Sequence, residues 1–258
     1  MASDQTVIDR RDHAWGIELT GFGRPFGLGI DGHGRLHVTD MDRHCVVRFD
    51  AALSTHDVIA AGAWNGPHSI DFAPDGRAVV ACYYTPGIYV IGEDRPLAAN
   101  LTGPASAFFN DSGRLLVSEY SQNAVLALEA DGRLAFTFAG SFDRPHMARV
   151  VGDGTVIVAD TWNNRLQRFS SAGELLDQSV ATVSRPVAVD PDPQRGWLVT
   201  AWGDNGVMRF DERGRYAGRL DAPALQKPYD ARWLSNDRVA IADSHHARVL
   251  ILQSPQIH

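Results

Sequence analysis

The sequence predicts an all-β protein, a six-bladed β-propeller of four-stranded antiparallel blades whose ring is closed by the N-terminal strand. Three observations predict it: a proline that recurs six times, short β-branched runs at fixed offsets behind each proline, and no helical period of useful length. With 44% apolar residues the chain can bury a real core. We expect residues 1–258 to form one propeller domain.

The repeat begins with a basic residue or a glycine followed by proline. The six prolines are Pro25, Pro67, Pro104, Pro145, Pro186 and Pro228, separated by 42, 37, 41, 41 and 42 residues. Propeller blades have this length, because each blade is one sheet of four short strands. Six such repeats predict a ring of six blades.

Each proline opens a first strand, and later strands follow at regular offsets. Second strands are expected at 36–40, 78–82, 115–119, 156–160, 197–201 and 239–243. Third strands are expected at 46–49, 88–91, 125–128, 166–169, 207–210 and 249–252. A fourth stretch is clearest at 134–140 and 216–220.

The sixth repeat lacks a fourth strand of its own, because the sequence ends soon after the third. Residues 15–23, which precede the first proline, have fourth-strand character. We expect this segment to pair with the last blade, since an unsealed ring would expose two sheet edges.

Charge and composition exclude several classes of protein. The net charge is -7 with no Lys/Arg block, which argues against nucleic acid as a partner. No run approaches the roughly 18 apolar residues of a membrane helix, so no membrane is expected. Two cysteines, Cys45 and Cys82, and no secretory signal favour a soluble, cytoplasmic protein.

The segment RPHMARVVGDGTVIVADTWNNRLQRF (144–169) resembles an NHL repeat, and residues 24–49 match similarly. The NHL pattern runs proline, apolar strand, Gly-rich turn, V-x-D, Asn-x-Arg and a further apolar strand. Repeats two, three and five carry Cys82, Glu119 and Ala201 where the aspartate is usual. The resemblance implies a propeller, whereas function depends on the site, because propellers carry many unrelated activities.

In a propeller, the residues just after each proline converge on one mouth of the central channel, together with the loops between second and third strands. The aromatic members of this set are Phe26, Tyr83, Tyr84, Tyr120, Trp162, Trp202 and Tyr229. We therefore expect a small, partly apolar organic ligand there, bound by a few placed polar groups.

Two Pro-His steps are the sharpest feature of this set. His68 and His146 hold the same repeat position on non-adjacent blades, and two imidazoles can begin a zinc site. The arrangement resembles peptidyl-hydroxyglycine lyases, propellers whose histidines hold zinc at the channel mouth. Where symmetry asks for a third histidine, this chain has Tyr229 and Asp230, which we include among the candidate catalytic residues.

The two histidines also have interpretations that involve no metal. Each histidine can instead hydrogen-bond the backbone of a neighbouring blade, or serve as a neutral acid, base or orienting group. His44 and His246 fall on or next to the Asn-His step of the NHL pattern and are expected to be structural.

Charged residues lie further along the inner strands. Asp71 is expected to pair across the channel with Arg149 or Arg232, since buried charges need partners. The functional alternative is that these arginines bind a substrate carboxylate below the histidines.

Two function classes follow. The first is an enzyme of the lyase, isomerase or cyclase type, working at His68, His146 and Tyr229 with no cofactor or with a divalent metal such as zinc. The second is a non-catalytic scaffold that docks a peptide or a protein partner. Calcium-dependent lactone hydrolysis is disfavoured, because Glu18, Asn110 and Asp160 do not fall at matching repeat positions.

Overall fold

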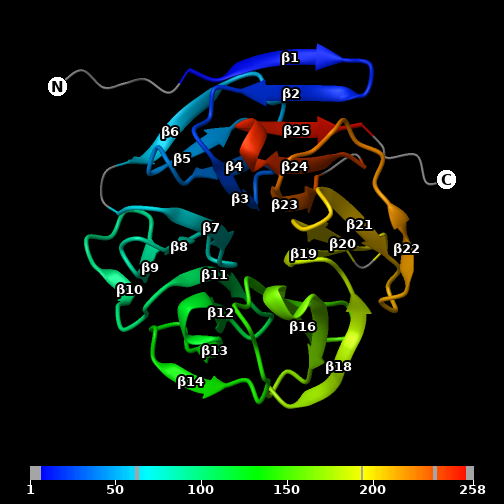
Figure 1. The fold of residues 1–258 in the computed structure, drawn as a ribbon. Coiled ribbons are helices and arrows are strands. Elements are labelled where there is room, and N and C mark those ends of the chain that lie inside the picture. Colours follow the sequence, from blue (N-terminus) through cyan, green and yellow to red (C-terminus); the bar gives the residue numbers. More distant parts are fainter. Residues whose placement is uncertain (1–6, 62–63, 193, 235–236, 254–258) are drawn as a thin grey trace.

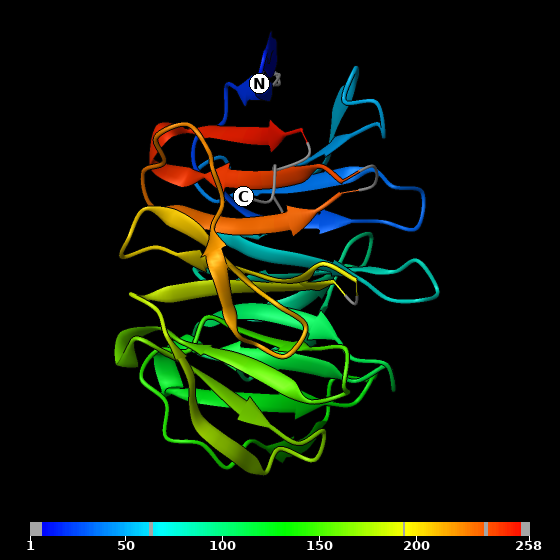
Figure 2. The ribbon, with the colours of Figure 1, turned by 90° about the vertical axis from the view of Figure 1, so that its right-hand side faces the viewer.

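The computed structural model, which describes residues 7–61, 64–192, 194–234 and 237–253, is a ring of six antiparallel sheets (Figure 1). The sheets follow one another around the ring in chain order, and the first strand of each lies innermost. The view from the side shows the N-terminal hairpin next to the C-terminal strands (Figure 2). The fold is therefore the predicted six-bladed β-propeller.

The blades have these bounds. Blade one contains β3 (Pro25–Ile30), β4 (Leu36–Asp40), β5 (Cys45–Phe49) and β6 (His56–Ala61). Blade two contains β7 (Pro67–Phe72), β8 (Ala78–Cys82), β9 (Gly87–Val90) and β10 (Pro96–Ala98). Blade three contains β11 (Pro104–Phe109), β12 (Leu115–Glu119), β13 (Ala124–Leu128) and β14 (Leu134–Thr137).

The second half of the ring repeats this plan. Blade four contains β15 (Met147–Val150), β16 (Val156–Asp160), β17 (Arg165–Phe169) and β18 (Leu175–Thr182). Blade five contains β19 (Pro186–Asp192), β20 (Gly196–Ala201), β21 (Gly206–Phe210) and β22 (Tyr216–Arg219). Blade six contains β23 (Pro228–Trp233), β24 (Val239–Asp243), β25 (Arg248–Leu252), β2 (Gly16–Thr20) and β1 (Asp9–His13).

The N-terminal strand closes the ring, as predicted. β2 pairs with β25 in antiparallel register from Gly16 opposite Leu252 to Thr20 opposite Arg248. One detail differs from the sequence prediction: β1 adds a fifth strand to this sheet. All of its residues are exposed, and the polar sequence DRRDH suits a strand at a solvent edge.

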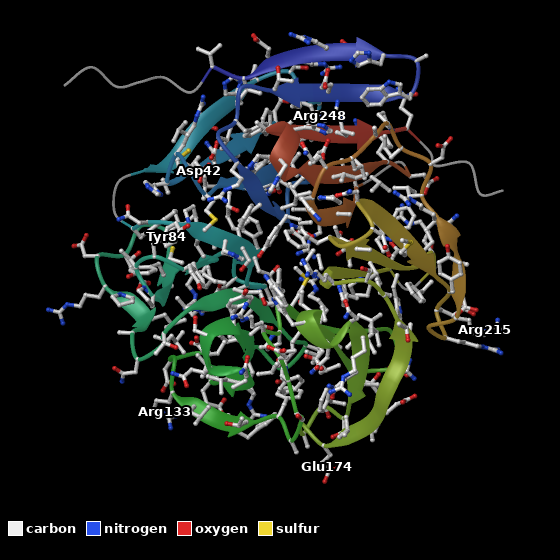
Figure 3. The ribbon with its side chains drawn as sticks, in the orientation of Figure 1. Asp42, Tyr84, Arg133, Glu174, Arg215 and Arg248 are labelled. Atoms are coloured by element: carbon white, nitrogen blue, oxygen red, sulfur yellow. The ribbon has the colours of Figure 1, made fainter. Side chains whose placement is uncertain are left out.

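The core lies between neighbouring blades. Phe108 of blade three packs with Met147 and Ile157 of blade four and with Val189 and Trp197 of blade five. Trp197 and Phe108 are at most 2% exposed, so these sheets are packed face to face. Charged residues such as Arg133, Glu174 and Arg215 project instead from the outer edge of the ring (Figure 3).

Short 3-10 turns follow the second strand in three blades. They are η1 (Tyr120–Gln122), η2 (Thr161–Asn163) and η3 (Ser244–His246), each ended by a residue in the left-handed conformation. Within the described ranges, no helix has the length and apolar character needed to cross a membrane.

Candidate active site

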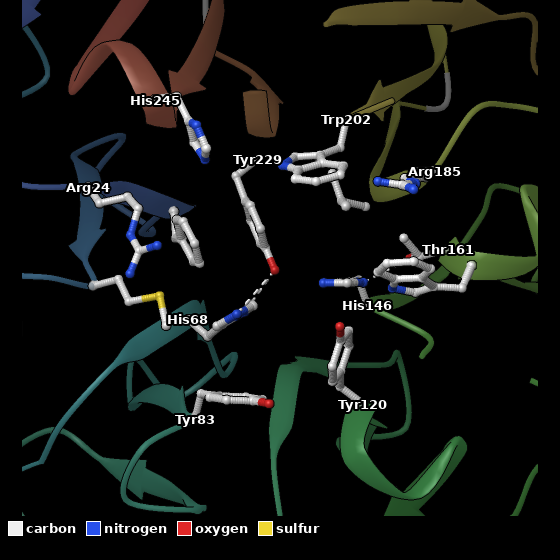
Figure 4. A pocket seen from close by; sticks show the side chains of 14 residues that line it. Arg24, His68, Tyr83, Tyr120, His146, Thr161, Arg185, Trp202, Tyr229 and His245 are labelled. Carbon is white, nitrogen blue, oxygen red and sulfur yellow. Dashed lines mark hydrogen bonds between the residues drawn. The ribbon is translucent and has the colours of Figure 1, made fainter. Parts of the chain in front are cut away.

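A cavity of about 230 Å³ opens where the inner strands begin, and it gathers the predicted aromatic and histidine residues (Figure 4). The predicted members that line it are Phe26, His68, Tyr83, Tyr120, His146, Trp162, Trp202 and Tyr229. Met41, Arg24, Thr161, Arg185, Val187 and His245 complete the lining. Residues from all six blades thus share one cavity.

An irregularity in the inner strands aims these side chains. In blade two, Pro67 pairs with Cys82 and Ser69 with Ala81, so His68 is an extra residue that the second strand does not match. Blade six has the same shift between Pro228 and Asp230, which leaves Tyr229 unmatched. Such bulges redirect a side chain, and here they turn both residues toward the cavity.

Phe26 supports the tyrosine. Its ring stacks on that of Tyr229, with centroids 3.8 Å apart and planes 5° from parallel. The Phe26 ring also meets the edge of His68 at 4.9 Å. Three rings from blades one, two and six therefore pack as one unit, which fixes the position of the Tyr229 hydroxyl.

The hydrogen bonds of His68 determine its tautomer. Nδ1 lies 2.9 Å from the carbonyl oxygen of Ala105, which can only accept, so Nδ1 carries the proton. Nε2 is then an acceptor, and the Tyr229 hydroxyl, 3.1 Å away, donates to it.

His146 has the same tautomer through a different partner. The Thr161 hydroxyl lies 2.6 Å from the carbonyl oxygen of Pro186 and must donate there. It therefore accepts from Nδ1 of His146, at 2.8 Å, so that Nδ1 carries the proton. Nε2 of His146 is left with a free lone pair, and the imidazole points into the cavity (Figure 4).

Both imidazoles are neutral near pH 7. Their ring centroids lie 6.1 Å apart. Burial lowers the pKa of His68 to about 4, and burial together with the neighbouring His68 lowers the pKa of His146 to about 3. The pKa of Tyr229 is raised well above 10, mainly by burial, so its hydroxyl keeps its proton. The cavity thus offers one unbonded imidazole acceptor, Nε2 of His146, beside a Tyr229 hydroxyl that donates to Nε2 of His68.

The charged candidates lie elsewhere in the channel. Arg149 and Arg232 line a second cavity with Asp71 and Asp190, not the one that holds the histidines. Arg149 lies 3.9 Å from Asp71, which is the predicted pairing across the channel. Arg232 lies 2.8 Å from Asp190.

Asp230 also differs from its expected place. It is 1% exposed, accepts the Leu28 amide at 2.9 Å and lies 3.2 Å from Arg232. Burial raises its pKa to about 6. The structure therefore joins Asp230 to the channel charges and separates it from Tyr229, its neighbour in sequence.

The residues do not complete a metal site of the kind expected. Among the described residues, no group of three or more His, Cys, Asp and Glu side chains could hold an ion. His68 and His146 supply two imidazoles, and Nε2 of His68 is already bonded to Tyr229. Catalytic zinc usually takes three protein ligands, so we derive no step through a metal.

The aspartate of the V-x-D pattern is structural. Asp40, Asp160 and Asp243 end the second strands of blades one, four and six and are completely buried. Asp40 accepts the backbone amides of Gly23 and Arg24 at 2.7 and 3.0 Å. The aspartate therefore anchors the segment that leads into the first strand of its own blade.

The two histidines of the Asn-His step lie outside the cavity. His246 bonds Asp243 through Nδ1 at 2.8 Å. Nδ1 of His44 accepts the Gly66 amide at 3.1 Å. These contacts fit the structural role expected for both residues.

Comparison with known proteins addresses the repeat directly. A family model of the NHL repeat matches residues 142–169. This segment is an NHL repeat. It covers the last residues of the connection between blades three and four and the first three strands of blade four. His146 and Thr161 of the site lie within it. No curated protein matches the chain in sequence.

Solved structures match 83% to 98% of the chain at low identity. Virginiamycin B lyase from Staphylococcus aureus is 14% identical with a TM-score of 0.70, over 98% of this chain and 97% of that one. A gluconolactonase from Xanthomonas campestris is 16% identical with a TM-score of 0.73, over 98% of both chains. A chain of the nidogen–laminin complex is 14% identical with a TM-score of 0.68, over 83% and 93%. These likenesses show the fold.

Proposed function

We propose that the protein is an enzyme of the lyase, isomerase or cyclase type, which moves a proton on a small organic substrate by general acid–base catalysis. His146 is the base, Tyr229 the hydrogen-bond donor, and His68 the residue that orients Tyr229. The observation that supports this proposal most directly is that Nε2 of His68, Nε2 of His146 and the Tyr229 hydroxyl lie at a single cavity. Groups so placed within reach of one ligand typically contribute 10²–10⁴-fold to a rate.

The environment selects the kind of proton that is removed. Nε2 of His146 accepts the substrate proton and becomes an imidazolium, which burial disfavours. A reaction that creates a negative charge beside the imidazolium offsets this cost. Removing a proton from carbon next to a carbonyl creates an enolate. The Tyr229 hydroxyl has one proton, so when the substrate binds it turns from Nε2 of His68 and donates to the enolate oxygen. As the enolate re-forms the carbonyl, the imidazolium returns the proton to another carbon in an isomerisation. In a lyase reaction the bond to a leaving group on the next carbon breaks instead, and the leaving group takes the proton.

Enzymes in the same fold support this class. The Staphylococcus aureus virginiamycin B lyase was solved as a catalytically inactive histidine-to-alanine variant with quinupristin. A histidine is thus needed for lyase activity in one propeller of similar shape.

Deuterium wash-in tests the proposal on any substrate that carries a proton next to a carbonyl. The protein is incubated with a library of small carbonyl compounds in D₂O, and mass spectrometry follows deuterium gain at carbon. We expect at least one compound to exchange, and His146→Gln to slow that exchange by roughly 100-fold or more. Tyr229→Phe keeps the ring that stacks on Phe26 and should slow exchange through loss of the hydroxyl alone.

Tyr84→Phe is the matched control. Tyr84 is 55% exposed and is not among the residues that line the cavity, so this variant should exchange at the wild-type rate. Unchanged exchange in His146→Gln, or no exchange by the wild type with any compound, would contradict the proposal. Metal analysis of the purified protein forms a separate arm. Stoichiometric zinc that is lost in a His68→Ala/His146→Ala variant would replace the acid–base proposal with a metal-assisted one.

A docking scaffold is the second candidate, and exposed aromatic residues near the mouth favour it. Tyr84 and Trp162 are 55% and 39% exposed. Large exposed aromatics are common in protein interfaces. A peptide library displayed against the wild type and a Tyr84→Ala/Trp162→Ala variant separates the candidates. Peptides that need both aromatics, in a protein without deuterium exchange, would favour the scaffold.

A further inference from the structure

Three basic residues form an arc on the rim of the cavity. Arg144, Arg185 and Lys227 stand immediately before the prolines of blades four, five and six, and we call them the cationic arc. The corresponding residues of blades two and three are Gly66 and Gly103. The arc therefore covers one side of the mouth only.

Aromatic side chains alternate with the arc. The Arg185 guanidinium lies over Trp162 at 4.5 Å and over Trp202 at 5.2 Å. The Arg144 guanidinium also lies over two rings, 4.8 Å from the centre of Trp162 and 5.6 Å from that of Tyr120. The Lys227 ammonium lies 4.0 Å from the centre of Trp202. These rings hold the cations in place, and Arg185, Trp162 and Trp202 themselves line the cavity.

The backbone of the arc is unusual. Arg144, Arg185 and Lys227 have φ angles of 50°, 47° and 51°. A left-handed conformation costs a side-chain-bearing residue roughly 1–2 kcal/mol, and glycine avoids that cost. Blade two shows that glycine is compatible with this position, because Gly66 has φ 67°. Three consecutive blades nevertheless place a long cation there, which points to a role for the side chains.

The preceding blade holds each of these residues. Oδ1 of Asn123 accepts the Arg144 amide at 2.8 Å, and Oδ1 of Asn164 accepts the Arg185 amide at 3.0 Å. Asn205 does the same for Lys227 at 2.9 Å. The three cations therefore start from equivalent, fixed backbone positions around the rim.

Among the described residues, no carboxylate neutralises the arc. Arg24, before the proline of blade one, bonds Asp42 at 2.6 Å. In the described parts of the chain, by contrast, Arg144, Arg185 and Lys227 form no ion pair. The whole chain carries a net charge of -7, so three such cations, Arg185 in the cavity lining and the other two over aromatic rings that line it, are a local excess of positive charge.

We propose that the cationic arc binds the oxyanion group of the substrate, a carboxylate or a phosphate ester, so that the substrate is a small organic anion with its reactive carbon near His146. This rests on the proposed function for the position of the reactive carbon, but not for the binding of the anion. Arginine suits the role because its planar guanidinium can donate two hydrogen bonds to one oxyanion. The aromatic rings between the cations offer apolar surface to the rest of the substrate.

A small anion fits better than a nucleic acid. A polyanion needs basic residues along an extended path, whereas the described rim carries its unpaired cations on one side only. The net charge of -7 also repels a long phosphate chain. The arc is matched to one anionic group beside a cavity.

Binding of matched aromatic probes tests the proposal. Benzoate, benzamide and phenyl phosphate have similar rings and differ in the attached group, and their dissociation constants are measured by titration calorimetry. We expect benzoate or phenyl phosphate to bind at least about tenfold more tightly than neutral benzamide, as one charge-assisted pair allows. The stronger of the two anions identifies the oxyanion.

Arg185→Gln should remove most of that preference, while Arg185→Lys keeps the charge and should retain part of it. Arg215→Gln is the matched control, since Arg215 belongs to the same blade but projects from the outer edge of the ring (Figure 3). It should bind all three probes like the wild type. Equal binding of benzamide and of both anions by the wild type would overturn the proposal. So would affinity for single-stranded oligonucleotides that rises with their length.

His146→Gln separates this proposal from the proposed function. It should keep the preference for anionic probes while losing deuterium exchange. If the preference persists and no variant or wild type exchanges deuterium, the anion site stands and the acid–base proposal fails. If exchange is intact and Arg185→Gln leaves both exchange and probe binding unchanged, the anion site fails alone.

Discussion

His68 and His146 each serve two purposes at once. Nδ1 of His68 donates to Ala105 of the next blade, and Nδ1 of His146 donates to Thr161, which in turn bonds Pro186 of the next blade. These bonds give the structural role expected as the bland alternative for a histidine at a strand start. They also fix the tautomer, which directs Nε2 of His68 to the Tyr229 hydroxyl and leaves Nε2 of His146 for the cavity. The structural and chemical interpretations therefore hold together for the same residue.

Burial of the imidazoles makes stability depend on pH. The folded-state pKa of His68, about 4, lies below the ordinary value of 6.5, so the folded protein binds fewer protons than the unfolded chain between these values. The stabilising contribution is present above about pH 6.5 and is lost as the pH falls toward 4. Lowering the pH from about 7 to about 5 should reduce the free energy of unfolding of the wild type and, to a smaller extent, that of His68→Gln. We predict that the reduction is about 2 kcal/mol smaller in His68→Gln. Urea unfolding at the two pH values measures this difference.

His33→Gln is the control for this experiment. His33 is exposed in a turn, and its replacement should leave the pH dependence as in the wild type. Identical pH dependence in the wild type and His68→Gln would show that His68 is not a buried neutral imidazole.

At the scale of the element, a buried acid fixes the crossing between blades. Asp160 accepts the Asp143 amide at 2.8 Å through Oδ1. Its Oδ2 accepts from Asn163, Arg165 and Gln167 at 2.9, 2.8 and 2.7 Å. One carboxylate thus ties the segment before Pro145 to the third strand of the same blade, and the amide that it holds is next to Arg144.

We predict that Asp160→Ala lowers the free energy of unfolding by roughly 3–5 kcal/mol, because the half-buried Arg165 loses its carboxylate, the buried Gln167 loses one of two acceptors, and the Asp143 amide loses its acceptor. Asp153→Ala, in an exposed turn of the same blade, should change it by about 1 kcal/mol or less. Chemical denaturation of both variants provides the measurement. Equal losses would mean that the V-x-D aspartate does not anchor the blade.

At the scale of the whole molecule, the repeat makes the inner part of each blade predictable. The second strands lie within one residue of their expected bounds in all six blades, because each is a short apolar run between turn residues. The outer strands are harder to predict. β10 (Pro96–Ala98) has only three residues, and β1 is fully exposed, so neither carries the apolar alternation that marks a half-buried strand.

The site divides in the same way. His68, His146 and Tyr229 each follow the proline of their repeat, and this shared position correctly predicts that they line one cavity. The prediction depends only on the symmetry of the ring. The expected place of Asp230 is wrong, because the bulge after Pro228 leaves Tyr229 at the cavity and Asp230 buried against Leu28 and Arg232. No residue pattern in one sequence marks that bulge. The sequence prediction of the site also misses Thr161, Arg24 and Arg185. The recurring basic residue before proline is a usable signal for the two arginines.

The central claim is that the ring brings two neutral imidazoles together with both Nε2 atoms facing one cavity, and long-range proton–nitrogen NMR tests it most directly. His68→Gln and His146→Gln assign the two imidazoles, and their nitrogen shifts are followed with pH. The account predicts a proton on Nδ1, none on Nε2, and no titration of either ring between about pH 5 and about pH 8. Titration of either ring near its ordinary pKa of 6.5, or a proton on Nε2 of His146, would contradict it.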